Sequence, residues 1–164
     1  MSMVECLCKC GAIAVLFAST AFAQLPISLG VRVGAPLGGP FKPYIFGPTV
    51  EVRFPIIAVR VIADALYTRI EGEPGSGRNV WEVPIMARLE ARNLLVSPFI
   101  GAGPAFRWYP GFNVDTQRGF AVGGGVRVSI LLLKLTPEIR YTKYGENQLR
   151  DSGGHAQFLL GITF

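Results

Sequence analysis

The chain has 164 residues, a length that indicates one domain. Half of its residues are hydrophobic, yet from residue 24 onward no apolar run approaches the roughly 18–20 residues that a membrane-spanning helix needs. The formal net charge is +5, and the basic residues are scattered singly, so the charge pattern does not favour nucleic acid as a partner.

The first 23 residues are typical of a signal peptide. An apolar stretch runs from Gly11 to Phe17, and Ala21 and Ala23 follow in the A-x-A arrangement that signal peptidase cleaves. We therefore expect residues 1–23 to be removed and the mature chain to start at Gln24. A short membrane anchor is the less favoured alternative, because the apolar part is too short to span a bilayer.

All three cysteines precede the predicted cleavage site, at Cys6, Cys8 and Cys10. The predicted mature domain, residues 24–164, then has no cysteine, so no disulfide framework and no cysteine-based metal site are expected there. We expect no cofactor.

Eight segments of the mature chain alternate with period two, which is the signature of a strand with two different faces. In chain order they are residues 27–35, 50–54, 59–67, 81–89, 100–108, 120–128, 133–141 and 157–164. One face of each segment is almost entirely hydrocarbon, and the other carries charges and glycines. Glycine is abundant and turn residues recur at short intervals, which favours many short strands over helices.

The connections between these segments alternate between long and short. Long polar stretches occupy residues 37–46, 71–79, 109–118 and 145–154, and tight turns lie near Pro55, Asn93 and Leu131. Outer-membrane barrels have long extracellular loops and short periplasmic turns. The sequence therefore predicts an all-β fold, an eight-stranded antiparallel up-and-down transmembrane barrel with both ends of the mature chain in the periplasm.

The charged face is predicted to point into the barrel. An isolated charge in so narrow an interior is costly unless it is paired, and arginine can bind a carboxylate through two hydrogen bonds. We expect a network of Arg–carboxylate pairs that plugs the lumen, because eight strands enclose only enough room for their own side chains. Its predicted members are Arg32, Glu51, Arg53, Arg60, Asp64, Glu82, Arg88, Arg107, Arg127, Glu138 and Arg140.

Five outward aromatic residues are predicted to lie at the strand ends next to the long loops. They are Tyr67, Trp81, Trp108, Phe120 and Tyr141, and aromatic rings of this kind form girdles at membrane interfaces. Ordinary core aromatics are the alternative. Prolines within strands, Pro84, Pro98, Pro104 and Pro137, are expected at bulges or strand ends, because a closed barrel has no edge strand.

Groups that could carry catalysis are sparse. His155 is the only histidine, and its sequence neighbours supply no obvious hydroxyl or carboxylate partner. We expect it to be a solvated residue of the rim. The glycine clusters at 101–103 and 123–125 lack the following helix of a phosphate loop, and glycines that face the lumen would make room for long side chains.

The mature chain resembles the small outer-membrane β-barrel proteins of Gram-negative bacteria, the OmpA-like barrel-domain type without a periplasmic domain. The segments that carry the resemblance are residues 30–34, 47–51, 81–84, 98–104 and 137–141, and the last strand is the most specific. That strand, with Phe158, Leu160, Ile162 and a final Phe164, resembles the signal read by the barrel-assembly machinery. The resemblance implies fold and location and supplies no catalytic residues. Inward Ile62, Leu66 and Leu159 depart from the polar lumen of the family.

We therefore expect a monomeric protein of the bacterial outer membrane with a structural or surface-interaction role through its extracellular loops. Its expected partners are outer-membrane lipid, including lipopolysaccharide, and the assembly machinery during biogenesis. We expect no enzymatic activity. The alternatives are a narrow channel for small solutes, a soluble lipocalin-like carrier with its apolar face inside, and a lipid-modifying enzyme.

Overall fold

The computed structural model describes residues 27–38, 44–54, 59–70, 77–91, 95–111, 115–130, 133–145 and 153–164. The predicted signal peptide and its cysteines lie outside the described residues. In the described part, no helix is long and apolar enough to cross a membrane.

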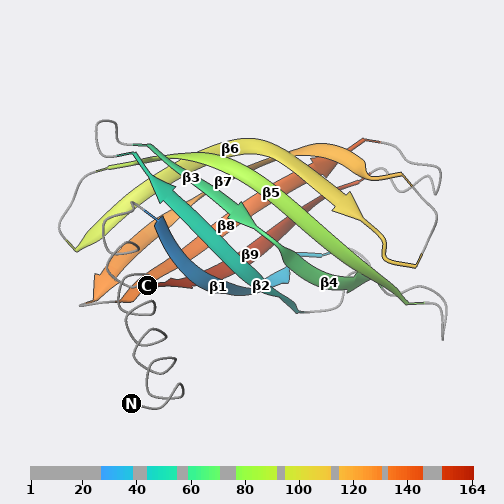
Figure 1. Ribbon diagram of the computed structural model, residues 1–164, viewed down its shortest axis with the longest axis horizontal. Helices are drawn as coiled ribbons and strands as arrows, with labels where there is room; N and C mark the ends of the chain where they lie inside the picture. The colour runs from blue at the N-terminus through green and yellow to red at the C-terminus, as the bar shows by residue number, and fades with distance from the viewer. Residues whose placement is uncertain are drawn as a thin grey trace, which may run out of the picture.

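The strands form a single closed antiparallel sheet (Figure 1). Apart from β3 and β4, which do not pair with each other, each strand pairs with its neighbour along the chain, and β1 pairs with both β2 and β9, which closes the barrel. The strands are β1 (Ile27–Pro36), β2 (Ile45–Arg53), β3 (Val59–Asp64), β4 (Leu66–Ile70), β5 (Arg78–Glu90), β6 (Val96–Trp108), β7 (Gln117–Ile130), β8 (Leu133–Tyr144) and β9 (Gly154–Thr163).

β3 and β4 are two parts of one crossing strand, so nine segments make an eight-stranded barrel. Both lie between β2 and β5, and their register is continuous: Thr49 pairs with Asp64 and Phe46 with Tyr67. The predicted eight-stranded antiparallel barrel is thus confirmed.

Two prolines account for the break at Ala65. The amide of Ala65 donates to the carbonyl of Pro48 at 3.0 Å, but Pro48 has no N–H with which to return the bond. On the other side, the register of β5 places Pro84 opposite Asp64, where a second donor is missing. Ala65 therefore lacks one ladder hydrogen bond from β2, and its neighbour Asp64 lacks one from β5.

Pro98 lies near the start of β6, in line with the expectation from sequence, whereas Pro104 and Pro137 mark neither bulges nor strand ends. Across Pro104, β6 and β7 pair without a change of register. At Pro137 the pairs of β7 and β8 stop at Gly125–Glu138 and resume at Val128–Leu135 in the same register. A barrel of this length keeps enough ladder bonds on either side to hold the register across the missing donors.

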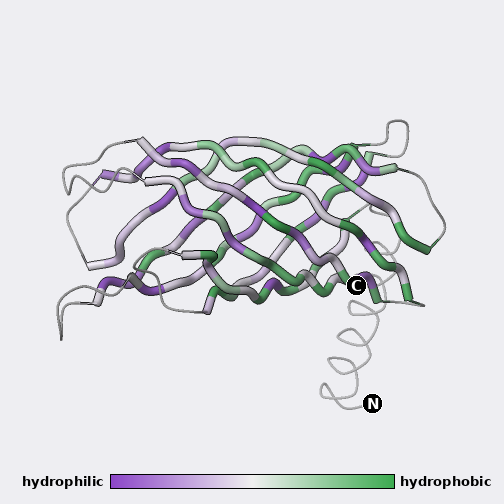
Figure 2. Tube along the Cα trace, turned by 180° about the vertical axis from the view of Figure 1, so that it is seen from behind, coloured by the Kyte–Doolittle hydropathy of each residue, from purple (hydrophilic) through white to green (hydrophobic). Residues whose placement is uncertain are grey.

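Apolar and polar residues alternate along each strand (Figure 2). The outward residues are apolar and remain exposed, and Ile100 and Ile139 reach 67% and 60% exposure. The inward residues include charged side chains such as Arg32 and Arg140, both at 0%. A soluble sheet would bury the hydrocarbon and expose the charges, so this exterior is made for contact with lipid.

The strand ends that the long connections join lie at the opposite end of the barrel from the strand ends that the short connections join (Figure 1). Residues 37–44, 71–77, 109–116 and 145–153 connect strands at what we call the loop end. Residues 54–58, 91–95 and 131–132 connect them at the turn end, where β9 also finishes. There the amide of Phe164 donates to the carbonyl of Leu29 at 3.0 Å.

Candidate functional site

The middle of the lumen holds a cluster of three arginines and two carboxylates, which we call the central cluster. Asp64 binds Arg32 through Oδ1 at 2.8 Å and Arg140 through Oδ2 at 2.7 Å. Glu138 pairs with Arg140 at 2.9 Å and also with Arg32 and Arg88. These residues come from β1, β3, β5 and β8, so the cluster ties strands together across the barrel.

Near the loop end a second group, the loop-end cluster, is centred on Glu82. Arg107 lies directly opposite Glu82 in the ladder and donates to its Oε1 through Nε and Nη2, at 3.0 and 2.8 Å. Gln157 donates to the other oxygen at 3.1 Å, and His155 Nε2 is 3.4 Å from it. Arg107 also stacks on the ring of Tyr144, with its guanidinium carbon 3.9 Å from the ring centroid.

The loop-end cluster is covered by buried aromatic and amide side chains. Tyr109 and Tyr144 are 3% and 2% exposed. Tyr109 donates to Gln117 at 3.2 Å, and Gln117 donates to the carbonyl of Gly145 at 3.1 Å. In the described part of the chain, these buried side chains occupy the lumen between the loop-end cluster and the loops.

A third group, the turn-end cluster, occupies the opposite end of the lumen. Arg127 reaches Glu51 at 2.8 Å and Glu90 at 3.3 Å, and Arg60 pairs with Glu90. Glu90 was not among the predicted network members, because it ends its strand and its inward direction depends on how far β5 extends. The sequence signal was its spacing of two from Arg88.

Arg53 lies outside this network, although the sequence placed it inside. It is exposed at the end of β2, directly opposite Arg60 in the ladder. Arg60 already pairs with Glu90, so Arg53 faces a like charge and remains exposed at the end of its strand. The structure brings the other ten predicted network residues into the three clusters.

Lumen-facing glycines provide space for the clusters. A Cβ at Gly101 would lie 2.7 Å from Arg88 Cγ, and one at Gly123 would lie 2.9 Å from Glu138 Oε1. Both distances are too short for a real Cβ contact, and at each position a backbone carbonyl also lies 2.9 Å away, so a side chain there would require the charged residue and the neighbouring strand to shift.

His155 is buried at 7% exposure, which corrects the expectation of a solvated rim histidine. β9 begins at Gly154, so the alternation of the strand turns His155 inward together with Gln157. Arg107 Nη2 lies 3.2 Å from the Nδ1 of His155. Among the described residues, no group of three or more His, Cys, Asp or Glu is placed to hold a metal ion.

An arc of aromatic rings follows the outside of the barrel near the loop end. Neighbouring ring centroids are 5.3 Å apart for Phe46 and Tyr67, 5.5 Å for Tyr67 and Trp81, and 6.2 Å for Trp81 and Trp108. Tyr44 extends the arc, and the predicted Phe120 and Tyr141 are exposed on the same outer face. Tyr44 and Phe46 were not among the predicted girdle residues, because the sequence pattern placed them in a loop.

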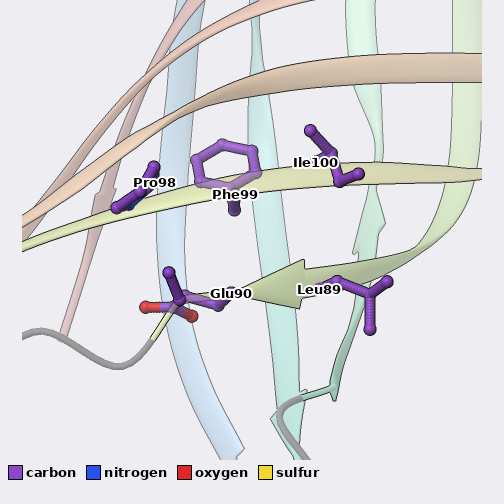
Figure 3. Close-up of a pocket in the computed structure, with 6 residues that line it drawn as sticks. Leu89, Glu90, Pro98, Phe99 and Ile100 are labelled. Atoms are coloured by element: carbon purple, nitrogen blue, oxygen red, sulfur yellow. The ribbon is translucent and has the colours of Figure 1, made fainter.

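A shallow groove of about 330 Å³ lies on the barrel near the turn end, and its lining is mostly apolar. Figure 3 shows Leu89 and Glu90 at the end of β5 beside Pro98, Phe99 and Ile100 of β6. Leu89 and Ile100 are 58% and 67% exposed, so the groove opens toward the lipid-facing side. It offers a surface for hydrocarbon and brings together no set of reactive groups.

Solved structures with the same architecture are small outer-membrane barrels. Neisserial surface protein A is 13% identical, with a TM-score of 0.66, and the match covers 84% of this chain and 94% of that one. The N-terminal β-barrel domain of OprF from Pseudomonas aeruginosa is 14% identical, covering 84% and 97%, with a TM-score of 0.52. OprG from the same organism is 10% identical, covering 84% and 94%, with a TM-score of 0.50.

This chain has the fold of a small outer-membrane β-barrel. That fold, together with an exterior made for lipid, places the protein in the bacterial outer membrane and excludes the lipocalin-like arrangement with apolar residues inside. At sequence identities of 10–14%, the similarity to these proteins establishes the fold alone. The comparison with family models finds no match, and the comparison with curated proteins finds none either.

Proposed function

We propose that this protein is an integral outer-membrane barrel with a structural or surface-interaction role, carried out by the loops at its loop end. The observation that supports the proposal is the filled lumen: three ion-pair clusters lie one after another along the barrel. Arg32, Glu82 and Arg127 represent the three clusters and are at most 2% exposed. A rigid barrel with a closed interior leaves recognition to the loops, where binding residues concentrate on such scaffolds.

The proposal includes further roles that follow from the sequence. Phe158, Leu160, Ile162 and Phe164 would form the signal for the barrel-assembly machinery, and the mature protein would be a monomer surrounded by outer-membrane lipid and lipopolysaccharide. His155 would have a structural role, because its contacts with Glu82, Arg107 and Gln157 help to close the lumen. No enzymatic activity is proposed.

Two measurements test the proposal. Proteoliposomes that contain the barrel and entrapped glucose or chloride should release either solute no faster than protein-free liposomes. Faster release that scales with the amount of barrel would favour a narrow channel instead. In intact cells, a cysteine introduced at Asp115, which is exposed in the third loop, should react with a membrane-impermeant maleimide. Failure to label would contradict the assignment of the loop end to the cell exterior.

A further inference from the structure

In the described strands, the outer face of the barrel carries charge near the loop end only. Among the outward-facing positions of the described strands, three are charged, and all three are cationic: Arg69 on β4, Arg118 on β7 and Lys143 on β8. Each is exposed. No outward position of the described strands is acidic, and none near the turn end is charged.

These cations lie just above the aromatic arc. On each strand, the cation is the next outward residue toward the loops from an exposed or half-exposed aromatic residue. Arg69 follows Tyr67 and Lys143 follows Tyr141 on strands that run toward the loops. Arg118 precedes Phe120 on a strand that runs away from them. Aromatic girdles mark the boundary between hydrocarbon and headgroups. The three cations are therefore at the height of the headgroups in the outer leaflet.

Two of the cations are neighbours. Lys143 lies directly opposite Phe120, so Arg118 is its diagonal neighbour on the same face of the β7–β8 pair. Side chains in this relation have Cβ atoms roughly 7–8 Å apart or less, within reach of one shared anion for long side chains. Neither residue forms an ion pair with another residue in the described part of the chain.

A hydroxyl group lies next to this pair. Gly154 is the ladder partner of Lys143, and a Cβ at Gly154 would lie 1.9 Å from the Tyr141 hydroxyl oxygen. Tyr141 therefore extends across β9 toward the loop end. The guanidinium of Arg118 on β7, the ammonium of Lys143 on β8 and the phenol of Tyr141, which reaches over β9, are therefore neighbours on the outer face. Below them, Val122 and Ile139 present exposed hydrocarbon.

We propose that Arg118, Lys143 and Tyr141 form a binding site for a phosphate group of the phosphorylated glycolipid of the outer leaflet, lipopolysaccharide, whose acyl chains would lie along the hydrocarbon below. The site rests on the proposed function, because it requires the loop end to face outward. Charge-assisted hydrogen bonds from arginine and lysine suit a phosphate, and the apolar surface beneath suits a lipid better than a free anion. Arg69 on β4 has no second outward cation beside it in the described strands, so it would contribute less to the binding of a phosphate.

The site can be tested with lipid A as the probe. The full barrel, folded in zwitterionic detergent, would be titrated with bisphosphorylated lipid A, and the bound lipid counted by native mass spectrometry. Each cation near an anionic headgroup contributes about a fivefold change in affinity. We expect the double variant Arg118→Gln/Lys143→Gln to bind lipid A more than tenfold more weakly. The matched control Arg69→Gln should stay within about fivefold of the unaltered chain.

Three further arms give the test its specificity. Lipid A stripped of its phosphates should bind as weakly to the unaltered chain as the intact lipid binds to the double variant. Inorganic phosphate at millimolar concentration should not displace the lipid. All variants should keep the heat-modifiable gel migration of a folded barrel. Equal binding of lipid A by the double variant, or equal binding of the dephosphorylated lipid, would overturn the site. Loop labelling in cells tests the orientation separately.

Discussion

At the scale of single residues, Glu138 is the carboxylate on which the central cluster depends. It is 1% exposed and pairs with Arg32, Arg88 and Arg140. Glu138→Gln should leave these three arginines with Asp64 as their remaining carboxylate. Breaking a buried pair by removing one partner costs about 3–5 kcal/mol, so the free energy of unfolding should fall by that amount. Urea unfolding in phospholipid vesicles, followed by tryptophan fluorescence, measures it.

The control for this variant is Asp115→Asn, the same chemical change at an exposed loop position. It should change the free energy of unfolding by no more than about 0.5 kcal/mol. If the two variants unfold at the same urea concentration, Glu138 is solvated and the plugged lumen is wrong.

Two adjacent glycines on β7 give a second test at this scale. A Cβ at Gly123 would lie 2.9 Å from both Glu138 Oε1 and the carbonyl of Ile139, whereas the nearest atom to one at Gly124 is the carbonyl of Phe99 at 3.3 Å. Gly123→Ala should therefore destabilise the barrel by about 1–3 kcal/mol, the cost of overpacking. Gly124→Ala should cost clearly less in the same urea titration. Equal costs would show that the glycine cluster does not make room for the lumen network.

At the scale of elements, the break between β3 and β4 is attributed to missing donors. Pro48 is exposed and faces the carbonyl of Ala65 without an N–H to give. Pro48→Val should restore that bond and stabilise the barrel by about 0.5–1.5 kcal/mol. The new amide at position 48 should exchange slowly with deuterium. A control at Pro110→Val, in an exposed turn, should yield a fast-exchanging amide. Fast exchange at position 48 would mean that another cause separates β3 from β4.

At the scale of the whole molecule, the strand count and the two faces could be predicted from sequence because each depends on local patterns. Period-two alternation fixes which way Arg32 or Ile139 points, and the lengths of the connections fix which end holds the loops. Partner choice across the lumen could not be predicted. Arg32 and Glu138 are 106 residues apart, and which of them meet depends on how the strands are staggered around the closed barrel.

The exact ends of the strands also could not be predicted from the sequence. His155 and Glu90 both lie at or next to the end of a strand, where one residue more or less decides between the lumen and water. The alternation predicted the direction of Arg53 but not its exposure, because direction alone does not tell how deep a residue lies in the barrel.

The central claim is that the hydrocarbon face of the sheet contacts lipid while the charged face lies inside. Single cysteines test it directly, because the chain has no cysteine from Gln24 onward. Ile139 is 60% exposed on the outer face, and Thr142, three residues along the same strand, is 1% exposed in the lumen. In the barrel folded in lipid vesicles, Ile139→Cys should react with a bilayer-confined maleimide and resist a water-soluble one. Thr142→Cys should not react with the bilayer-confined reagent. Labelling of position 139 from water together with labelling of position 142 from the bilayer would contradict the account, because the sheet would then be inside out.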